Sequence, residues 1–103
     1  MPYISVSHLR IADESAPALL AAFAKRAHLV EEADGFERLE VWQGSSDPGE
    51  VVMVSWWRDR AAFTQYMKSD AHAVSHNRIP TALQEEITLE RLEHLQGYEL
   101  MAT

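Results

Sequence analysis

The sequence predicts an α+β fold with the element order β-α-β-β-α-β. This is the split βαβ or ferredoxin-like arrangement, in which both helical regions cover one face of an antiparallel sheet. Apolar residues recur at helical spacing over residues 19–30, whereas residues 36–43 alternate and residues 50–57 are almost continuously apolar, as strands are. A length of 103 residues suits one compact domain, so we expect residues 1–103 to form a single unit.

The first strand and the first helix follow from apolar spacing and from capping residues. Residues 3–11 suit a strand. Residues 12–15 supply candidates for the cap of a helix, and Pro17 is tolerated in its first turn. We expect this helix to end before Asp34 and Gly35, because glycine readily adopts the left-handed conformation of a C-terminal cap.

The two middle strands form a predicted hairpin. Residues 36–43 and 50–57 flank the polar, glycine-containing turn at residues 44–49. The second strand contains the run VVMVSWW and has no polar side, so both faces of the sheet need cover. The helices cover one face. A second copy of the chain is the simplest cover for the other, and we expect a homodimer whose sheets close into a dimeric α+β barrel.

The remainder of the chain is predicted to hold two short helices and a final strand. Asp59 can cap a helix that ends near Lys68, and residues 69–70 can cap a second helix. Pro80 disfavours helical conformation in the residue before it, so the second helix ends there. We expect the last strand at residues 92–100, and the segment before it carries no clear pattern.

Composition excludes several classes of function. The chain has no cysteine, which excludes disulfides, thiolate nucleophiles and cysteine metal sites. A net charge of −7 argues against binding to nucleic acid, which needs clustered cations. The sequence has neither an apolar run long enough to span a membrane nor a secretory leader at its N-terminus. We therefore expect a cytoplasmic protein with no membrane partner.

Histidine carries the main chemical hypothesis. His76 is a candidate axial ligand of a haem iron, because neutral imidazole binds iron well. The alternative is a surface histidine stabilised by the C-terminal end of its helix. His72 and His76 are four residues apart and would share a helix face, but no third ligand accompanies them to complete a zinc site. His94 supports no functional prediction.

A family resemblance rests on a set of motifs spread over nearly the whole chain. These are Phe23 with Arg26, the turn at residues 34–36, the run WRDRAAF at residues 57–63, and residues 68–70 leading to His76. Together they resemble the antibiotic biosynthesis monooxygenase (ABM) superfamily of dimeric α+β barrels. Within it, the chain is most similar to the haem-degrading monooxygenases of the IsdG type.

The resemblance implies roles for individual residues. His76 matches the histidine that ligates the haem iron. Tyr66 stands where the haem-degrading relatives have a tryptophan that packs on the porphyrin and distorts it, and Ser7 stands where they have a distal asparagine. Arg26 can offer a cation to a haem propionate. Trp57 is expected in the sheet core, where it can also line a pocket for a flat aromatic ligand.

The resemblance also implies a reaction and leaves rivals open. The leading hypothesis is a haem-binding monooxygenase that opens the porphyrin with O2 and electrons from an external donor and releases iron, so that haem is both cofactor and substrate. One alternative is a cofactor-free ABM monooxygenase that oxidises a quinol or a polyketide-like aromatic. Another is a haem-binding module without catalysis. A shared fold does not decide among them.

Overall fold

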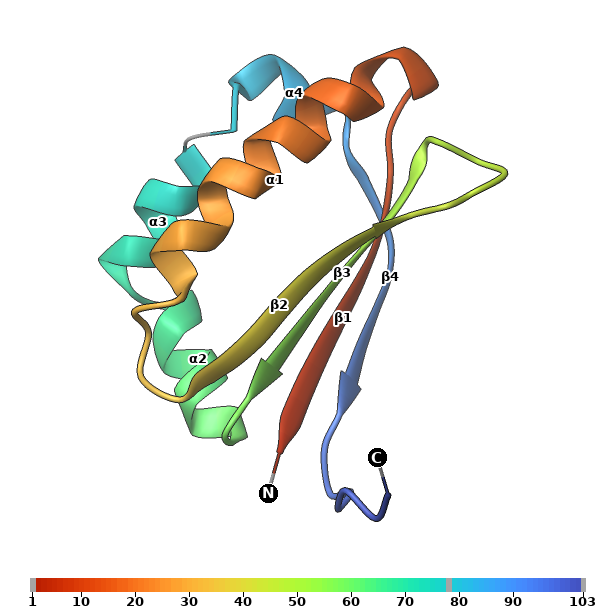
Figure 1. The fold of residues 1–103 in the computed structure, drawn as a ribbon. Coiled ribbons are helices and arrows are strands. Elements are labelled where there is room, and N and C mark those ends of the chain that lie inside the picture. Colours follow the sequence, from red (N-terminus) through yellow and green to blue (C-terminus); the bar gives the residue numbers. More distant parts are fainter. Residues whose placement is uncertain (1, 78, 103) are drawn as a thin grey trace.

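A computed structural model describes the backbone of residues 2–77 and 79–102, and their side chains except those of residues 26–29 and 74–77 (Figure 1). This part of the chain contains four strands, four α-helices and one short 3-10 helix, η1. In order they are β1 (Tyr3–Arg10), η1 (Asp13–Ser15), α1 (Ala16–Val30), β2 (Phe36–Gln43), β3 (Glu50–Trp57), α2 (Arg60–Met67), α3 (Asp70–Asn77), α4 (Thr81–Glu86) and β4 (Thr88–Leu95).

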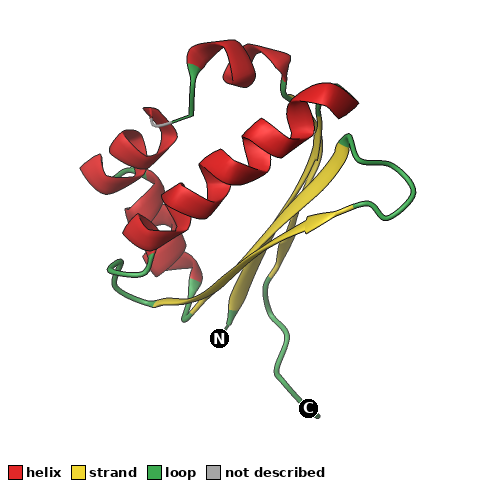
Figure 2. Ribbon diagram, turned by 45° about the horizontal axis from the view of Figure 1, so that its top comes forward, coloured by secondary structure: helices red, strands yellow, loops and turns green. Residues whose placement is uncertain are grey.

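The strands form one antiparallel sheet in the order β2-β3-β1-β4. The helices form a single layer on one of its faces (Figure 2). This arrangement confirms the predicted α+β, ferredoxin-like fold with a β2–β3 hairpin. No helix among the described residues is long and apolar enough to cross a membrane. The opposite face of the sheet, here called the outer face, carries no helix (Figure 1).

Capping side chains separate the helices as the sequence predicts. The Asp59 carboxylate accepts a hydrogen bond from the backbone N–H of Ala62 at 2.8 Å, which caps α2. The hydroxyl of Ser69 accepts one from the backbone N–H of His72 at 3.2 Å, at the start of α3. The predicted break between these two helices is therefore confirmed, and it separates Tyr66 on α2 from position 76 on α3.

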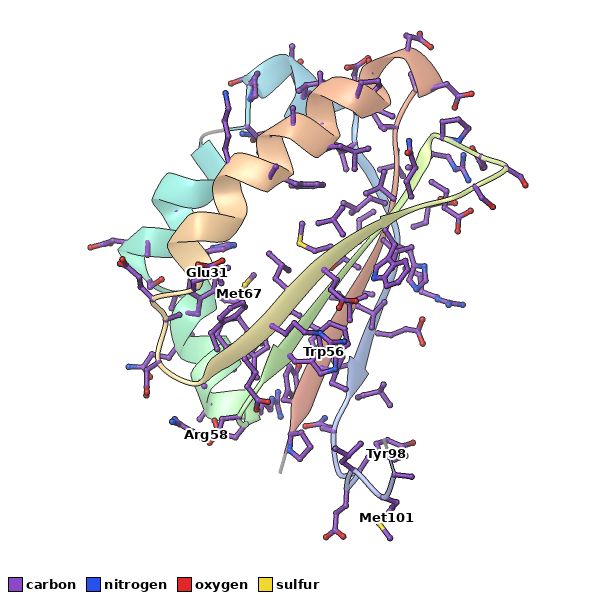
Figure 3. All side chains as sticks on the ribbon, in the orientation of Figure 1. Glu31, Trp56, Arg58, Met67, Tyr98 and Met101 are labelled. Carbon is purple, nitrogen blue, oxygen red and sulfur yellow. The ribbon has the colours of Figure 1, made fainter. Side chains whose placement is uncertain are left out.

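The prediction for the last strand was wrong by several residues. β4 occupies Thr88–Leu95 instead of residues 92–100, because β1 pairs with it from Ile4 opposite Leu95 to Arg10 opposite Thr88. Gly97 has a φ of 79°, a conformation that does not continue a strand. Tyr98 and Met101 lie beyond the strand and are exposed (Figure 3).

Two clusters of buried side chains hold the helices on the sheet. One surrounds α1 and consists of Ile11, Ala16, Leu19, Phe23, Val51 and Ile79. The other lies under α2 and consists of Tyr3, Val30, Trp57, Ala62 and Tyr66. The second cluster is mainly aromatic. It positions the cavity described below.

The turn between α1 and β2 needs glycine at position 35. The helix ends at Val30, and Gly35 has a φ of 80°, the left-handed conformation that was predicted for it. A Cβ atom there would overlap the Cβ of Ala62 on α2. The carbonyl of Gly35 also accepts a hydrogen bond from the backbone N–H of Arg58 at 2.7 Å, so this turn and the start of α2 are joined closely.

Candidate functional site

A cavity of about 480 Å³ lies between the helix-covered face of the sheet and helices α2 and α3. All four strands contribute to its floor, and α1 contributes Val30. The side chain of Met67 reaches into the space between α2 and the sheet (Figure 3). A volume of this size lies within the range of small-molecule sites in proteins.

Aromatic rings form one wall of the cavity. Trp57 is only 2% exposed and packs against Tyr66, with 5.3 Å between the ring centroids, and edge-on against Phe63 at 5.8 Å. The ring of Tyr66 in turn meets the imidazole of His72 edge-on at 5.4 Å. Such tilted and edge-to-face pairs are favourable for aromatic side chains, and together they hold Tyr66 in one orientation.

Strand register brings polar side chains to the floor. Ser5 lies opposite Ser55 on β3 and opposite His94 on β4, while Ser7 lies opposite Met53. Because alternate residues of a strand share a face, all of these side chains point toward the helices and line the cavity.

The structure brings three of the predicted site residues together. Ser7, Trp57 and Tyr66 all line this cavity, although they come from β1, β3 and α2. The side chains of Arg26 and His76 lie outside the described residues, so their predicted roles stay predictions.

The two adjacent tryptophans face opposite sides of the sheet. Trp57 is buried under α2, whereas Trp56 lies on the outer face (Figure 3). The guanidinium of Arg38 lies 4.0 Å from the centre of the Trp56 ring, a cation–π geometry. The prediction that the two rings point to opposite faces is confirmed.

Sequence reasoning missed His94. Its imidazole lines the cavity, and its Nδ1 is hydrogen-bonded to the hydroxyl of Tyr3, a residue 91 positions earlier in the chain. Burial raises the pKa of the Tyr3 phenol above its ordinary value, an effect that the positive charge of Arg60 partly offsets. Only the pairing of β1 with β4 places these two side chains together, and a strand pattern does not reveal that register.

His72 also lines the cavity, in contact with Tyr66, whereas the side chain of its possible metal-binding partner His76 lies outside the described residues. In the described part of the chain, no three His, Cys, Asp or Glu side chains converge in a way that could hold a metal ion. Lys68 is the one Lys or Arg among the described lining residues. The site thus combines an aromatic wall, hydroxyl groups, imidazoles and a cation.

Known proteins resemble this chain in sequence and in fold. The chain is 26% identical over 88 residues to a heme oxygenase (staphylobilin-producing) of Staphylococcus aureus, which covers 84% of this chain and 81% of the relative. A solved structure from Deinococcus radiodurans that carries the ABM family name superposes with a TM-score of 0.79 at 19% identity, over 98% of this chain and 97% of that one. SnoaB, a cofactor-independent oxygenase from Streptomyces nogalater, superposes with a TM-score of 0.75 at 15% identity, over 99% and 98%.

At these identities the two solved structures show a common fold and nothing finer. The family itself is shown by sequence. The profile of the antibiotic biosynthesis monooxygenase family matches residues 2–78, which include β1, the β2–β3 hairpin and the helices that build the cavity wall. The chain therefore belongs to the antibiotic biosynthesis monooxygenase (ABM) family.

Proposed function

We propose that this chain binds haem in the cavity and oxidises it with O2 and electrons from an external donor, which opens the porphyrin and releases iron. The observation that carries the proposal is the wall of Trp57, Phe63 and Tyr66 with an adjacent imidazole, in a cavity of about 480 Å³. The similarity to a heme oxygenase over most of both chains supports the same conclusion.

The donor set of the cavity fits a haem. Flat aromatic and apolar walls suit a macrocycle, and imidazole is a common axial ligand of haem iron. Lys68 offers a cation for a propionate, as Arg26 does in the sequence-based hypothesis. When bound, the haem supplies the iron-centred chemistry with O2, while the protein supplies binding, orientation and exclusion of water.

We assign His76 as the iron ligand. Position 76 follows His72, which lines the cavity, by one turn of α3. Tyr66 is assigned the ring-packing role, since its ring is already held by Trp57 and His72. Ser7 is assigned the distal polar contact, with a hydroxyl that can donate or accept a hydrogen bond on a shorter arm than asparagine has.

The test is a titration of the purified protein with haemin, followed by the Soret band, and then addition of ascorbate or a reductase in air. We expect a Soret shift on binding and loss of the band on reduction. His76→Ala should abolish the wild-type spectrum of the complex. His8→Ala is the matched control, because its imidazole lies on the outer face beside Glu93 and should leave the spectrum unchanged.

The other outcomes select the rival functions. Binding without loss of the Soret band under several electron donors would identify a non-catalytic haem-binding module. No Soret shift would contradict both haem hypotheses. It would leave the cofactor-free oxidation of a quinol or polyketide-like aromatic, which the hydroxyl groups of Ser5, Ser7 and Ser55 on the cavity floor favour.

We further infer that the chain works as a homodimer through the outer face. The centre of this face is apolar and only half-buried in one chain, and consists of Ile4, Val6, Val52, Val54 and Trp56. Ion pairs flank it, with Arg38 near Glu40 on β2 and Arg91 near Glu93 on β4. An apolar centre with a polar rim is typical of protein interfaces.

A further inference from the structure

A second cavity, of about 350 Å³, lies between the turn that follows α1 and the junction of α2 with α3. Its volume falls in the lower part of the range of small-molecule sites. Ala33, Ala62 and Ala71 give it an apolar lining. Tyr66 is the one described residue that lines both this cavity and the main one. The second cavity has no part in the proposed binding of haem.

The charged side chains that line the second cavity are acidic. Among the described residues they are Glu32 and Asp34, whereas the main cavity has Lys68. The guanidinium of Arg58 partly neutralises Asp34, with 3.3 Å between Nη2 and Oδ2. Glu32 takes part in no ion pair or side-chain hydrogen bond within the described part of the chain. The cavity thus has an uncompensated negative charge at its edge.

The end of α1 adds to this negative potential. The helix ends at Val30, Glu31 is its C-terminal cap, and Glu32 follows directly. The C-terminal end of a helix carries a partial negative charge and favours cations, so two carboxylates there are unfavourable unless a cation is present. Glu31, labelled in Figure 3, forms no ion pair with a described residue either. This end of the helix therefore lacks the positive charge that would stabilise it.

A buried hydroxyl at the second cavity also lacks a partner. Tyr66 is only 7% exposed, and its phenol group has no hydrogen-bond partner among the described residues. No fully enclosed polar side-chain atom in the described part of the chain is without a partner, so the phenol oxygen must border open space. Tyr66 follows Ala62 by one turn on the same face of α2, and Ala62 lines only the second cavity.

We propose that the second cavity binds a small organic cation. Its ammonium group would lie among the carboxylates of Glu32 and Asp34 and the hydroxyl of Tyr66, while its carbon body packs on the alanines. A primary ammonium has three N–H donors and no acceptor, which matches three oxygen acceptors. A bare metal ion fits less well, because no three His, Cys, Asp or Glu side chains converge among the described residues.

The probe is cyclohexylamine, which is protonated at neutral pH, and cyclohexanol is its uncharged twin. Isothermal titration calorimetry of the protein without added haem measures the affinity for each. We expect the amine to bind at millimolar concentration or below and the alcohol to bind much more weakly. High salt should weaken the amine, because exposed carboxylates are screened.

Three variants locate the binding site. Glu32→Gln removes an unpaired carboxylate and should weaken amine binding about threefold, as is typical for one exposed charge pair. Tyr66→Phe should weaken it about tenfold, because a buried acceptor of the ammonium is lost. Ala71→Leu changes no charge but fills the cavity, so it should abolish binding. Far-UV circular dichroism checks that each variant is folded.

A matched control removes the same charge elsewhere. Glu85→Gln lies on exposed α4, near the opposite end of α1 (Figure 1), and should bind the amine as wild type does. Glu32→Gln should also keep the Soret shift with haemin, so failure of this site and failure of haem binding are distinguishable.

Four results would overturn the proposal. Wild type binds no amine at millimolar concentration, or it binds cyclohexanol equally well. Glu32→Gln keeps the wild-type affinity. Glu85→Gln loses as much affinity as Glu32→Gln, which would mean that net charge alone attracts the amine. Folded Ala71→Leu still binds the amine, which would place the ligand outside the second cavity.

Discussion

Tyr66 lies where two cavities meet. It lines the main cavity and also a second one of about 350 Å³ beside Asp34 and Ser69. The residue is only 7% exposed, and its ring lies between those of Trp57 and His72. A larger ring at this position would thus have adjoining space to occupy without displacing the sheet.

This space leads to the first prediction. Tyr66→Trp should raise the rate of haem loss in the reductive assay severalfold, because a wider indole packs more extensively against a bound macrocycle. Adding Ser7→Asn should raise it further, since the longer amide offers two donors on the distal side. The rate of Soret decay in air is the measurement. Tyr66→Phe is the control, and equal rates for all three variants would contradict the assigned roles.

Gly35 and Gly97 offer a second comparison between single residues. Both have φ near +80°, but a Cβ at Gly35 would overlap Ala62, whereas a Cβ at Gly97 would meet nothing. Gly97→Ala should cost at most about 1–2 kcal/mol, the strain of the left-handed conformation alone. Gly35→Ala should lower the free energy of unfolding by more than this.

Urea unfolding measures both glycine variants. Adding Ala62→Gly to Gly35→Ala should recover part of the loss, because it removes the atom that clashes. If the two alanine variants were equally stable, the close approach between the turn and α2 would be wrong.

At the scale of elements, the start of α2 depends on a titrating cap. The backbone N–H of Ala62 chiefly, and the Arg58 guanidinium to a smaller extent, hold the pKa of the Asp59 carboxyl below its usual range. A carboxylate with a depressed pKa in the folded protein adds stability that is fully present above the unfolded pKa of about 4. That stability is lost as the pH falls through the lower folded value.

The third prediction compares wild type with Asp59→Asn across this range. Asparagine can still cap the helix but does not titrate. Wild type should therefore have the higher Tm at pH 7, and the difference should shrink as the pH falls below the unfolded pKa of about 4 and through the lower folded value. Thermal unfolding followed by circular dichroism checks it, with Glu37→Gln on exposed β2 as the control. A pH-independent difference would show that charge at the cap does not matter.

The boundaries of the elements show where local pattern suffices. β2 and β3 occupy the residues predicted for them, because alternation and the polar turn between them are local signals. The cap at Asp59 is equally local. The predicted bounds of β4 were wrong because the ends of this strand depend on which residues pair with β1. The local sequence of residues 88–101 does not specify that pairing.

At the scale of the whole molecule, the uncovered sheet face yields the fourth prediction. Val54→Asp should convert a dimer into a species with the 11.7 kDa mass of one chain, because a carboxylate at the centre of the apolar outer face would be desolvated in the interface. Light scattering coupled to size exclusion measures the mass. Ala61→Asp, on the exposed side of α2, adds the same charge and should leave the mass unchanged.

A monomeric wild-type protein at micromolar concentration would contradict both the dimer and the interpretation of the VVMVSWW strand. The test is independent of haem, so it does not share an outcome with the functional assays.

The sequence by itself determined the types and order of the main elements other than α4, the hairpin and the capped helix break. These rest on periodicity and cap chemistry, which act between residues close in the chain. Tertiary structure decided that Ser5, Ser55 and His94 share one cavity floor. It also decided that Trp57 is hydrogen-bonded to Ser55 and Tyr3 to His94. The physical reason is register, because strand pairing sets which distant residues become neighbours, and the alternation within a single strand is the same in every register.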